Sequence, residues 1–266
     1  KSAATLAGTY TPSQGTVQMQ VTAGPYQKSG LEGRITLAEE QRLTLTRLRL
    51  NHTTFAWENV GPLTVVRGPQ GQLDLQSLAL RNGRQEITAR GILKPGGDIA
   101  ADLQVRHLQL FFPVQMLAPQ AGVVDGEVTL RLSLRGTLAQ LQGEGDLHLT
   151  SLRWQQHDVG EVHGQVQIKG TVVRGDLRWR DQKQELLHLF GEASLDTRQA
   201  LTLQLQAANV DLQGLKAFIP AVVQSAGTLH LDLRLTGTLQ HPQVYGSLRV
   251  NDGVLQLATT GVRYKD

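Results

Sequence analysis

The chain has 266 residues, of which 40% are hydrophobic, 18% charged and 5% aromatic, and it contains no cysteine. This composition excludes a disulfide-rich scaffold, a collagen-like chain, a disordered chain and any site built on thiols. The net charge is +3 and the basic residues are scattered, so we predict no nucleic-acid partner. No apolar stretch approaches the about 20 residues of a transmembrane helix. We interpret the chain as a piece of a longer protein.

Short stretches of alternating apolar and polar residues occur along almost the whole chain. Alternation places one set of side chains on each face of a β-strand, which a helix of 3.6 residues per turn cannot do. In Leu43–Leu50 the apolar residues shift from odd to even positions after Thr46, and we predict a β-bulge there. Turn signals separate the strands and predict hairpins, among them Asn82-Gly83, Gly96-Gly97 and Asn251-Asp252-Gly253.

The alternation continues through the second half of the chain. In 128–135 every even residue is aliphatic and every odd residue is polar, and 229–235 repeats the pattern with four leucines. These patterns are typical of half-buried antiparallel strands and not of a parallel sheet. The sequence therefore predicts an all-β fold with a mostly antiparallel sheet.

Two segments break the alternation and predict short helices between hairpins. The first extends from Leu110 to Pro119, with Phe111 and Phe112 on its apolar side. The second begins at Asp211, which can cap a helix, and ends near Pro220.

These helices belong to an internal repeat of about one hundred residues. Gly126 and the Gly136-Thr137-Leu138 turn match Gly227 and Gly237-Thr238-Leu239, and similar matches occur at offsets of 99 to 102. We expect one continuous sheet over residues 1–266, with approximate repeats 1–100, 101–207 and a partial repeat 208–266. Repeats of this length predict a sheet extended along one axis.

The segment Gly227–Leu248, followed by Asn251-Asp252-Gly253, resembles the AsmA-like superfamily and most closely its TamB branch. The shared pattern is a glycine-led alternating strand, a Gly-Thr-Leu turn with proline, a Gly-x-Leu strand and an Asp-Gly turn. The resemblance covers residues 100–266 well. Residues 1–100 match through the repeat alone.

The resemblance implies a long, curved sheet folded over into a groove (a β-taco) that carries phospholipid between the inner and outer membranes. It implies a periplasmic protein that is anchored in the inner membrane in its full length. It also implies phospholipid acyl chains as partners and an outer-membrane assembly protein that binds through regions outside this sequence. It implies neither a cofactor nor a metal.

An apolar groove also has a physical rationale. Burying one methylene is worth about 0.8 kcal/mol, so an acyl chain in water costs on the order of 10 kcal/mol. A sheet with one aliphatic face can shield such a chain without specific recognition. The candidate groove residues are Leu103, Val105, Val128, Leu130, Leu132, Leu134, Leu147, Leu149, Leu201, Leu203, Leu205, Leu229, Leu231, Leu233, Leu235, Leu248 and Val250.

Two other functions fit the same pattern. One is a scaffold or chaperone for outer-membrane protein assembly that receives client strands on its apolar face or sheet edge. The other is a closed β-solenoid that binds glycans, for which Trp57, Trp154 and Trp179 are candidates. In a closed solenoid the leucines would form a packed core.

No residue pattern supports catalysis. His157, Asp158, Glu161 and His163 have ligand types that suit zinc, but we interpret them as solvent-facing residues of a turn and a strand. Gly143-Glu144-Gly145 lacks the third glycine of a dinucleotide fingerprint, and no phosphate-binding loop or nucleophile elbow occurs. We predict a protein that is not an enzyme.

Overall fold

The structure is a computed structural model. It describes residues 3–11, 13–23, 26–37, 40–51, 56–110, 124–154, 157–181, 185–195, 199–212, 222–238, 241–257 and 263–265. The chain forms two compact units, which are described separately. Unit 1 comprises residues 1–108 and 129–143, and unit 2 comprises residues 109–128 and 144–266.

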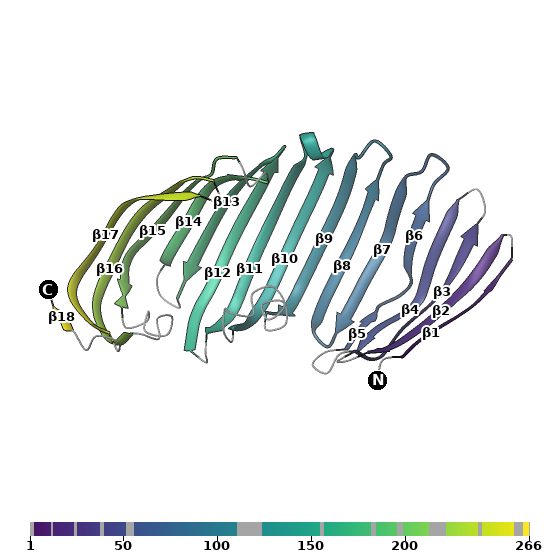
Figure 1. The fold of residues 1–266 in the computed structure, drawn as a ribbon, viewed down its shortest axis with the longest axis horizontal. Coiled ribbons are helices and arrows are strands. Elements are labelled where there is room, and N and C mark those ends of the chain that lie inside the picture. The colour runs from purple at the N-terminus through teal and green to yellow at the C-terminus, as the bar shows by residue number, and fades with distance from the viewer. Residues whose placement is uncertain are drawn as a thin grey trace. The chain divides into compact units, whose positions relative to one another are not determined.

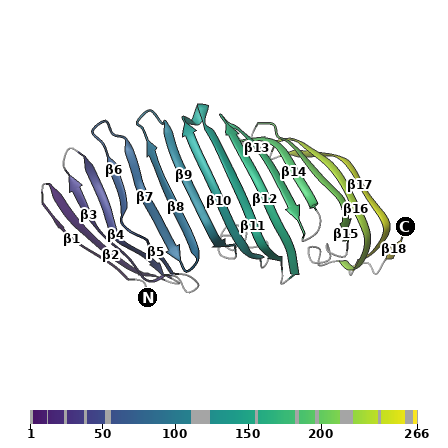
Figure 2. The ribbon, with the colours of Figure 1, turned by 180° about the vertical axis from the view of Figure 1, so that it is seen from behind.

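Unit 1 is built on a sheet of sequential antiparallel strands, visible in Figure 1 and from behind in Figure 2. Except at one interrupted strand, each strand pairs with the next, as the alternation predicts. Its strands are β1 (Ala3–Tyr10), β2 (Gln14–Ala23), β3 (Tyr26–Leu37), β4 (Gln41–Asn51), β5 (Ala56–Asn59), β6 (Leu63–Arg67), β7 (Leu73–Asn82), β8 (Gln85–Leu93) and β9 (Ile99–Gln109).

One strand of unit 1 is interrupted. β5 and β6 both pair with β4 on one side and with β7 on the other, so together they occupy a single place in the sheet. The break lies at Gly61 and Pro62. Gly61 has a φ of 79°, which glycine adopts readily, and Pro62 has no N–H to donate to a neighbouring strand.

The strands of unit 2 follow the same sequential antiparallel order. β10 (Val124–Gly136) and β11 (Gln142–Trp154) have residues in both units, and the 3-10 helix η2 (Leu138–Gln140) connects them. The remaining strands are β12 (His157–Lys169), β13 (Val172–Arg180), β14 (Glu185–Ser194), β15 (Thr202–Asp211), β16 (Val222–Gly237), β17 (Pro242–Leu257) and β18 (Arg263–Lys265).

The predicted fold class, an all-β protein with a mostly antiparallel sheet, is confirmed. The two predicted helices fall largely on 111–123 and 213–221, which lie outside the described residues. Among the described residues no α-helix connects the hairpins. None of the helices in this described part has the length and apolar character needed to cross a membrane.

The predicted β-bulge at Thr46 is confirmed. Glu32 pairs with Arg47 and Gly33 with Leu45, so Thr46 is the extra residue of β4. The Asn59 side chain stabilises this bulge, because its Oδ1 accepts from the Leu48 N–H at 2.7 Å and its Nδ2 donates to the Thr46 carbonyl at 3.2 Å. The bulge keeps the leucines on both sides of it on one face.

The predicted turn at Asn251-Asp252-Gly253 is wrong, because these residues lie inside β17. Asp252 has a φ of 50°, and Asp252 and Gly253 together lie opposite Gly227, so β17 has one extra residue at this bulge. Asparagine, aspartate and glycine favour both tight turns and left-handed bulge positions, so the sequence signal is the same for the two.

In the part of the chain that the structure describes, four residues other than glycine have positive φ, namely His107, Ser151, Asn209 and Asp252. His107 and Asn209 are 102 residues apart, and Ser151 and Asp252 are 101 apart. These spacings fall within the offsets of the predicted repeat. The repeat boundaries themselves, after 100 and 207, stay a prediction.

Candidate functional site

In unit 2 the predicted aliphatic residues lie opposite one another across neighbouring strands. Leu205 of β15 faces Leu189 of β14 and Leu233 of β16. Leu231 of β16 faces Leu248 of β17. Because side chains alternate between faces, these rows lie on a single face of the sheet, which we call the apolar face of unit 2.

One row crosses six strands of unit 2. It consists of Val166, Gly175, Gly191, Leu203, Leu235 and Val244, each opposite the next in register. A Cβ added to Gly175 meets no atom within 4 Å, so this part of the row opens onto free space. The row is therefore apolar along its whole length and has a depression at β13.

Unit 1 has an apolar face of the same kind. One row again crosses six strands and consists of Ile35, Leu43, Val65, Leu75, Gly91 and Ala101. Around it lies a hollow of about 400 Å³. The small residues Ala89, Gly91 and Ala101 leave room in this hollow, and its aliphatic lining includes Leu73, Leu75, Leu93, Ile99, Leu103, Leu132 and Leu134.

Protein covers the apolar faces only in part. Among the described residues no large side chain is less than 2% exposed, whereas a sandwich core would contain several. The chain exposes 17201 Å² of surface. A compact protein of 29.1 kDa exposes about 11,000 Å². This excess fits single-layer sheets whose apolar faces are not sealed by a second layer.

All candidate groove residues are described, and all lie in strands except Leu201, which directly precedes β15. Most are half-buried, as expected for an uncovered sheet face. Val105 and Leu201 are buried, at 7% and 3% exposure, and Leu248 on the outer strand β17 is 63% exposed. Leu103, Leu132 and Leu134 come together in the hollow of unit 1.

Several residues of the apolar faces were missed by the sequence analysis. In unit 2 these are Leu177, Trp179, Leu187 and Leu189, which continue the rows onto β13 and β14. In unit 1 the small residues Ala89, Gly91 and Ala101 were missed, because their contribution is the space above them and depends on the strand register. Alternation was the available signal for β14, where Leu187 and Leu189 are two residues apart.

The opposite face of each sheet is polar and contains most of the ion pairs. In unit 1 the Asp102 carboxylate accepts from Ser133 Oγ at 2.8 Å, from Arg135 Nη2 at 3.0 Å and from Arg90 Nε at 3.1 Å. The Ser133 and Arg135 hydrogen bonds hold the pKa of Asp102 below its usual value. Such a network connects β8, β9 and β10 on the solvent side.

The residues considered for zinc and for glycan binding make local contacts where the structure describes their side chains. His163 Nε2 lies 3.1 Å from Glu161 Oε1, and Asp158 Oδ1 accepts from the Gly160 N–H. Among the described residues no group of three histidines, aspartates or glutamates is placed to hold a metal ion. Trp57 is 9% exposed and belongs to unit 1, whereas Trp179 belongs to unit 2 and donates to the Val159 carbonyl. The Trp154 side chain lies outside the described residues.

Sequential antiparallel strands with one apolar face that protein covers only in part and one charged face define a repeat-type β-sheet protein. The family model of the TamB C-terminal domain matches residues 76–263, more than two thirds of the chain. The chain therefore belongs to the TamB family. No curated protein and no solved structure matches it significantly.

Membership in the TamB family confirms the resemblance to the TamB branch that the sequence predicts, and it indicates the general function. The family acts in bridge-like lipid transfer or outer-membrane protein assembly, is a family of cell-envelope proteins and is not an enzyme family.

Proposed function

We propose that this chain is a segment of a periplasmic conduit that carries phospholipid between the inner and outer membranes. The acyl chains of the phospholipid lie on the apolar faces of the two units. The observation that supports the proposal is the continuous aliphatic row across six strands in each unit, with side chains that remain half-exposed. An acyl chain on such a row regains part of the roughly 10 kcal/mol that its exposure to water costs, in proportion to the area that it buries.

The small residues deepen this surface locally. In unit 1 the hollow of about 400 Å³ falls within the usual size range of ligand pockets, about 300–1,000 Å³. Its aliphatic lining has no need of a polar anchor, because an acyl chain has no hydrogen-bonding group. The family adds a cell-envelope context, and we propose that the full-length protein is anchored in the inner membrane and contacts an outer-membrane assembly protein through other regions.

Photo-crosslinking tests the proposal at two adjacent residues. A photoreactive side chain at Leu203 lies on the apolar face, and one at Gln204 lies on the polar face of the same strand. In the presence of phospholipid vesicles we expect lipid adducts at position 203 and severalfold fewer at 204. Equal labelling at both positions, or none at 203, contradicts an acyl-chain site.

A second function has one specific observation in its favour. β18 pairs only with Val254, Leu255 and Gln256 of β17, so among the described residues 242–253 have a partner strand on one side alone. Val244 and Leu248 on this edge are 56% and 63% exposed. An open apolar edge can receive a client strand by β-augmentation, as an assembly scaffold requires. Capture of outer-membrane protein without lipid at position 203 favours this function.

The closed β-solenoid is the least supported alternative. A closed interior needs a dry, fully packed inner face, whereas Leu203, Leu233 and Leu235 are all half-exposed.

A further inference from the structure

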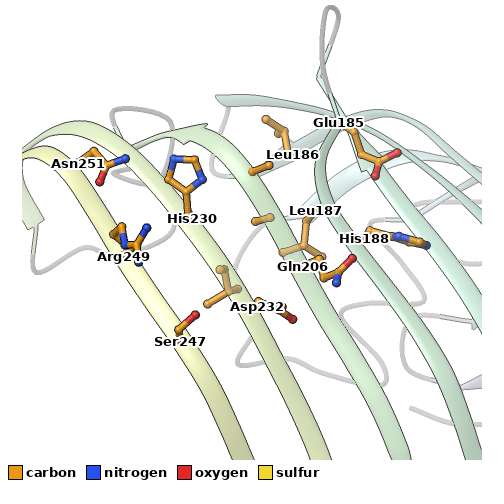
Figure 3. Close-up of a pocket in the computed structure, with 13 residues that line it drawn as sticks. Glu185, Leu186, Leu187, His188, Gln206, His230, Asp232, Ser247, Arg249 and Asn251 are labelled. Atoms are coloured by element: carbon orange, nitrogen blue, oxygen red, sulfur yellow. The ribbon is translucent and has the colours of Figure 1, made fainter.

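The polar face of unit 2 has a hollow of about 530 Å³ between β14 and β17, shown in Figure 3. Gln206 of β15 contributes to it, as do His230 and Asp232 of β16. Ser247, Arg249 and Asn251 follow one another along β17 on its other side. The bulge at Asn209 widens the space, because an extra residue increases the local twist and the neighbouring Ala208 has a small side chain.

The polar side chains of this hollow differ from those around it. Elsewhere on the polar face of unit 2 several charges are paired, as in Arg174 with Glu192 and Arg178 with Asp176, although Arg234 has no partner among the described residues. In contrast, the side chains of Gln206, His230, Asp232, Ser247, Arg249 and Asn251 make no hydrogen bond or ion pair within the described part of the chain. The hollow therefore presents one free cation and one free anion together with several uncharged hydrogen-bonding groups.

A similar hollow of about 560 Å³ on the polar face of unit 1 provides the comparison. There the Asp102 carboxylate accepts hydrogen bonds from Ser133, Arg135 and Arg90, so the hollow has no unpaired anion at this position, although Arg131 in its lining has no partner among the described residues. In unit 2 the corresponding place on β15 holds Gln204, which cannot pair with a guanidinium as a carboxylate does. The unit 2 hollow therefore differs from the unit 1 hollow in that it combines an unpaired anion, Asp232, with an unpaired cation, Arg249.

We propose that this hollow binds an α-amino acid group, with the carboxylate against Arg249 and His230 and the ammonium against Asp232. His230 lies directly opposite Arg249, and Asp232 directly opposite Ser247. Asp232 and Arg249 are therefore diagonal neighbours, with Cα atoms about 7–8 Å apart. This spacing leaves room for a ligand whose carboxylate and ammonium groups are attached to the same carbon. Ser247 and Asn251 supply further donors beside the carboxylate. The inference is independent of the proposed lipid function, which concerns the opposite face.

The charge pattern decides against two simpler ligands. A lone anion would be repelled by Asp232 and a lone cation by Arg249, whereas a zwitterion satisfies both. A sugar would use an aromatic platform, and the lining of this hollow contains none.

Titration of the isotope-labelled full chain with alanine, followed by amide chemical shifts, tests the proposal. We expect saturable shifts on β15, β16 and β17, with an affinity for alanine at least tenfold higher than for acetate or methylammonium at equal ionic strength. Arg249→Gln and Asp232→Asn should each reduce the affinity at least fivefold. Arg234→Gln is the matched control, because Arg234 is an equally unpaired arginine of the same face that does not line the hollow.

Three outcomes overturn the proposal. They are equal binding of acetate and alanine, stronger binding of an N-acetylglucosamine trimer, and alanine binding that survives both substitutions. The far-ultraviolet circular dichroism of each variant must match that of the wild-type chain, and the conservative Arg249→Lys should retain part of the affinity that Arg249→Gln loses.

Discussion

Gly175 of β13 lies directly opposite Gly191 of β14, so two neighbouring strands lack a side chain at the same level of the apolar face. The two glycines have different backbone constraints. Gly191 has a φ of 141°, and a Cβ there would lie 2.2 Å from the Thr202 carbonyl oxygen. Gly175 has no positive φ and faces open space. Substitution of Gly175 therefore tests the space available to a ligand, whereas substitution of Gly191 tests the backbone conformation that the fold requires.

Gly175→Leu should fill the depression without disturbing the sheet. We expect the free energy of unfolding to change by no more than about 0.5 kcal/mol, as for other uncrowded surface sites. Lipid capture, measured by native mass spectrometry after incubation with phospholipid, should fall severalfold. Unchanged capture would place the acyl chain elsewhere on the face.

Gly191→Ala is the contrasting change at the opposite residue. Its φ is accessible to glycine almost alone, so we expect a loss of about 1–3 kcal/mol in the free energy of unfolding. Urea denaturation measures this loss. A neutral result would mean that β14 can shift away from Thr202 at no cost.

Leu203→Asp should prevent lipid binding and leave the sheet folded. Leu203 is half-buried between Gly191 and Leu235, so the new carboxylate keeps contact with water. We expect a loss of about 1–2 kcal/mol in stability, which corresponds to partial loss of one leucine's burial. Gln204→Asp on the opposite face is the control for the added charge. Global unfolding of Leu203→Asp, seen by circular dichroism, would indicate a sealed core instead of a groove.

Asn59→Ala should destabilise unit 1 through the bulge at Thr46. The side chain accepts from Leu48 and donates to the carbonyls of Thr46 and Gly61, so its removal leaves three backbone groups without this partner. We expect a loss of about 1–3 kcal/mol in the free energy of unfolding. Asn251→Ala, which removes a side chain with no partner among the described residues, should be close to neutral in the same assay. Equal effects would refute a specific role for Asn59.

Asp102 should make the stability of unit 1 dependent on pH. Its pKa is lowered in the folded state, so its contribution is present above the usual value of 3.8 and disappears as the pH falls through the lower folded pKa. Asp102→Asn should therefore weaken the protein at pH 7 and make progressively less difference as the pH falls below 3.8, as measured by urea denaturation at each pH. Asp74→Asn, at an aspartate without an ion pair among the described residues, should show no such dependence. A constant difference for Asp102→Asn would contradict the linkage.

Alternation predicted the strands because one aliphatic face requires a period of two, as in Leu229–Leu235 of β16. It also located the Thr46 bulge, since a change of phase within one aliphatic run is visible in sequence. Alternation could not locate the apolar hollow of unit 1, because only the strand register brings the small residues Ala89 and Ala101 together in its lining. The bulge at Asp252 was mistaken for a turn because its residues suit both. The free charges of the polar hollow depend on which side chains pair across strands, which no single strand reveals.

The extra residue at Asn209 changes the phase of β15 without changing which of its sides is apolar. Before the bulge, Leu203, Leu205 and Ala207 alternate on odd positions, and after it Val210 and Leu212 continue on even positions. Deletion of Asn209 would bring these five residues into one unbroken alternation, so the oily and the hydrated sides of the strand would both be kept. The deletion would cost only the additional twist that the bulge gives to the end of β15.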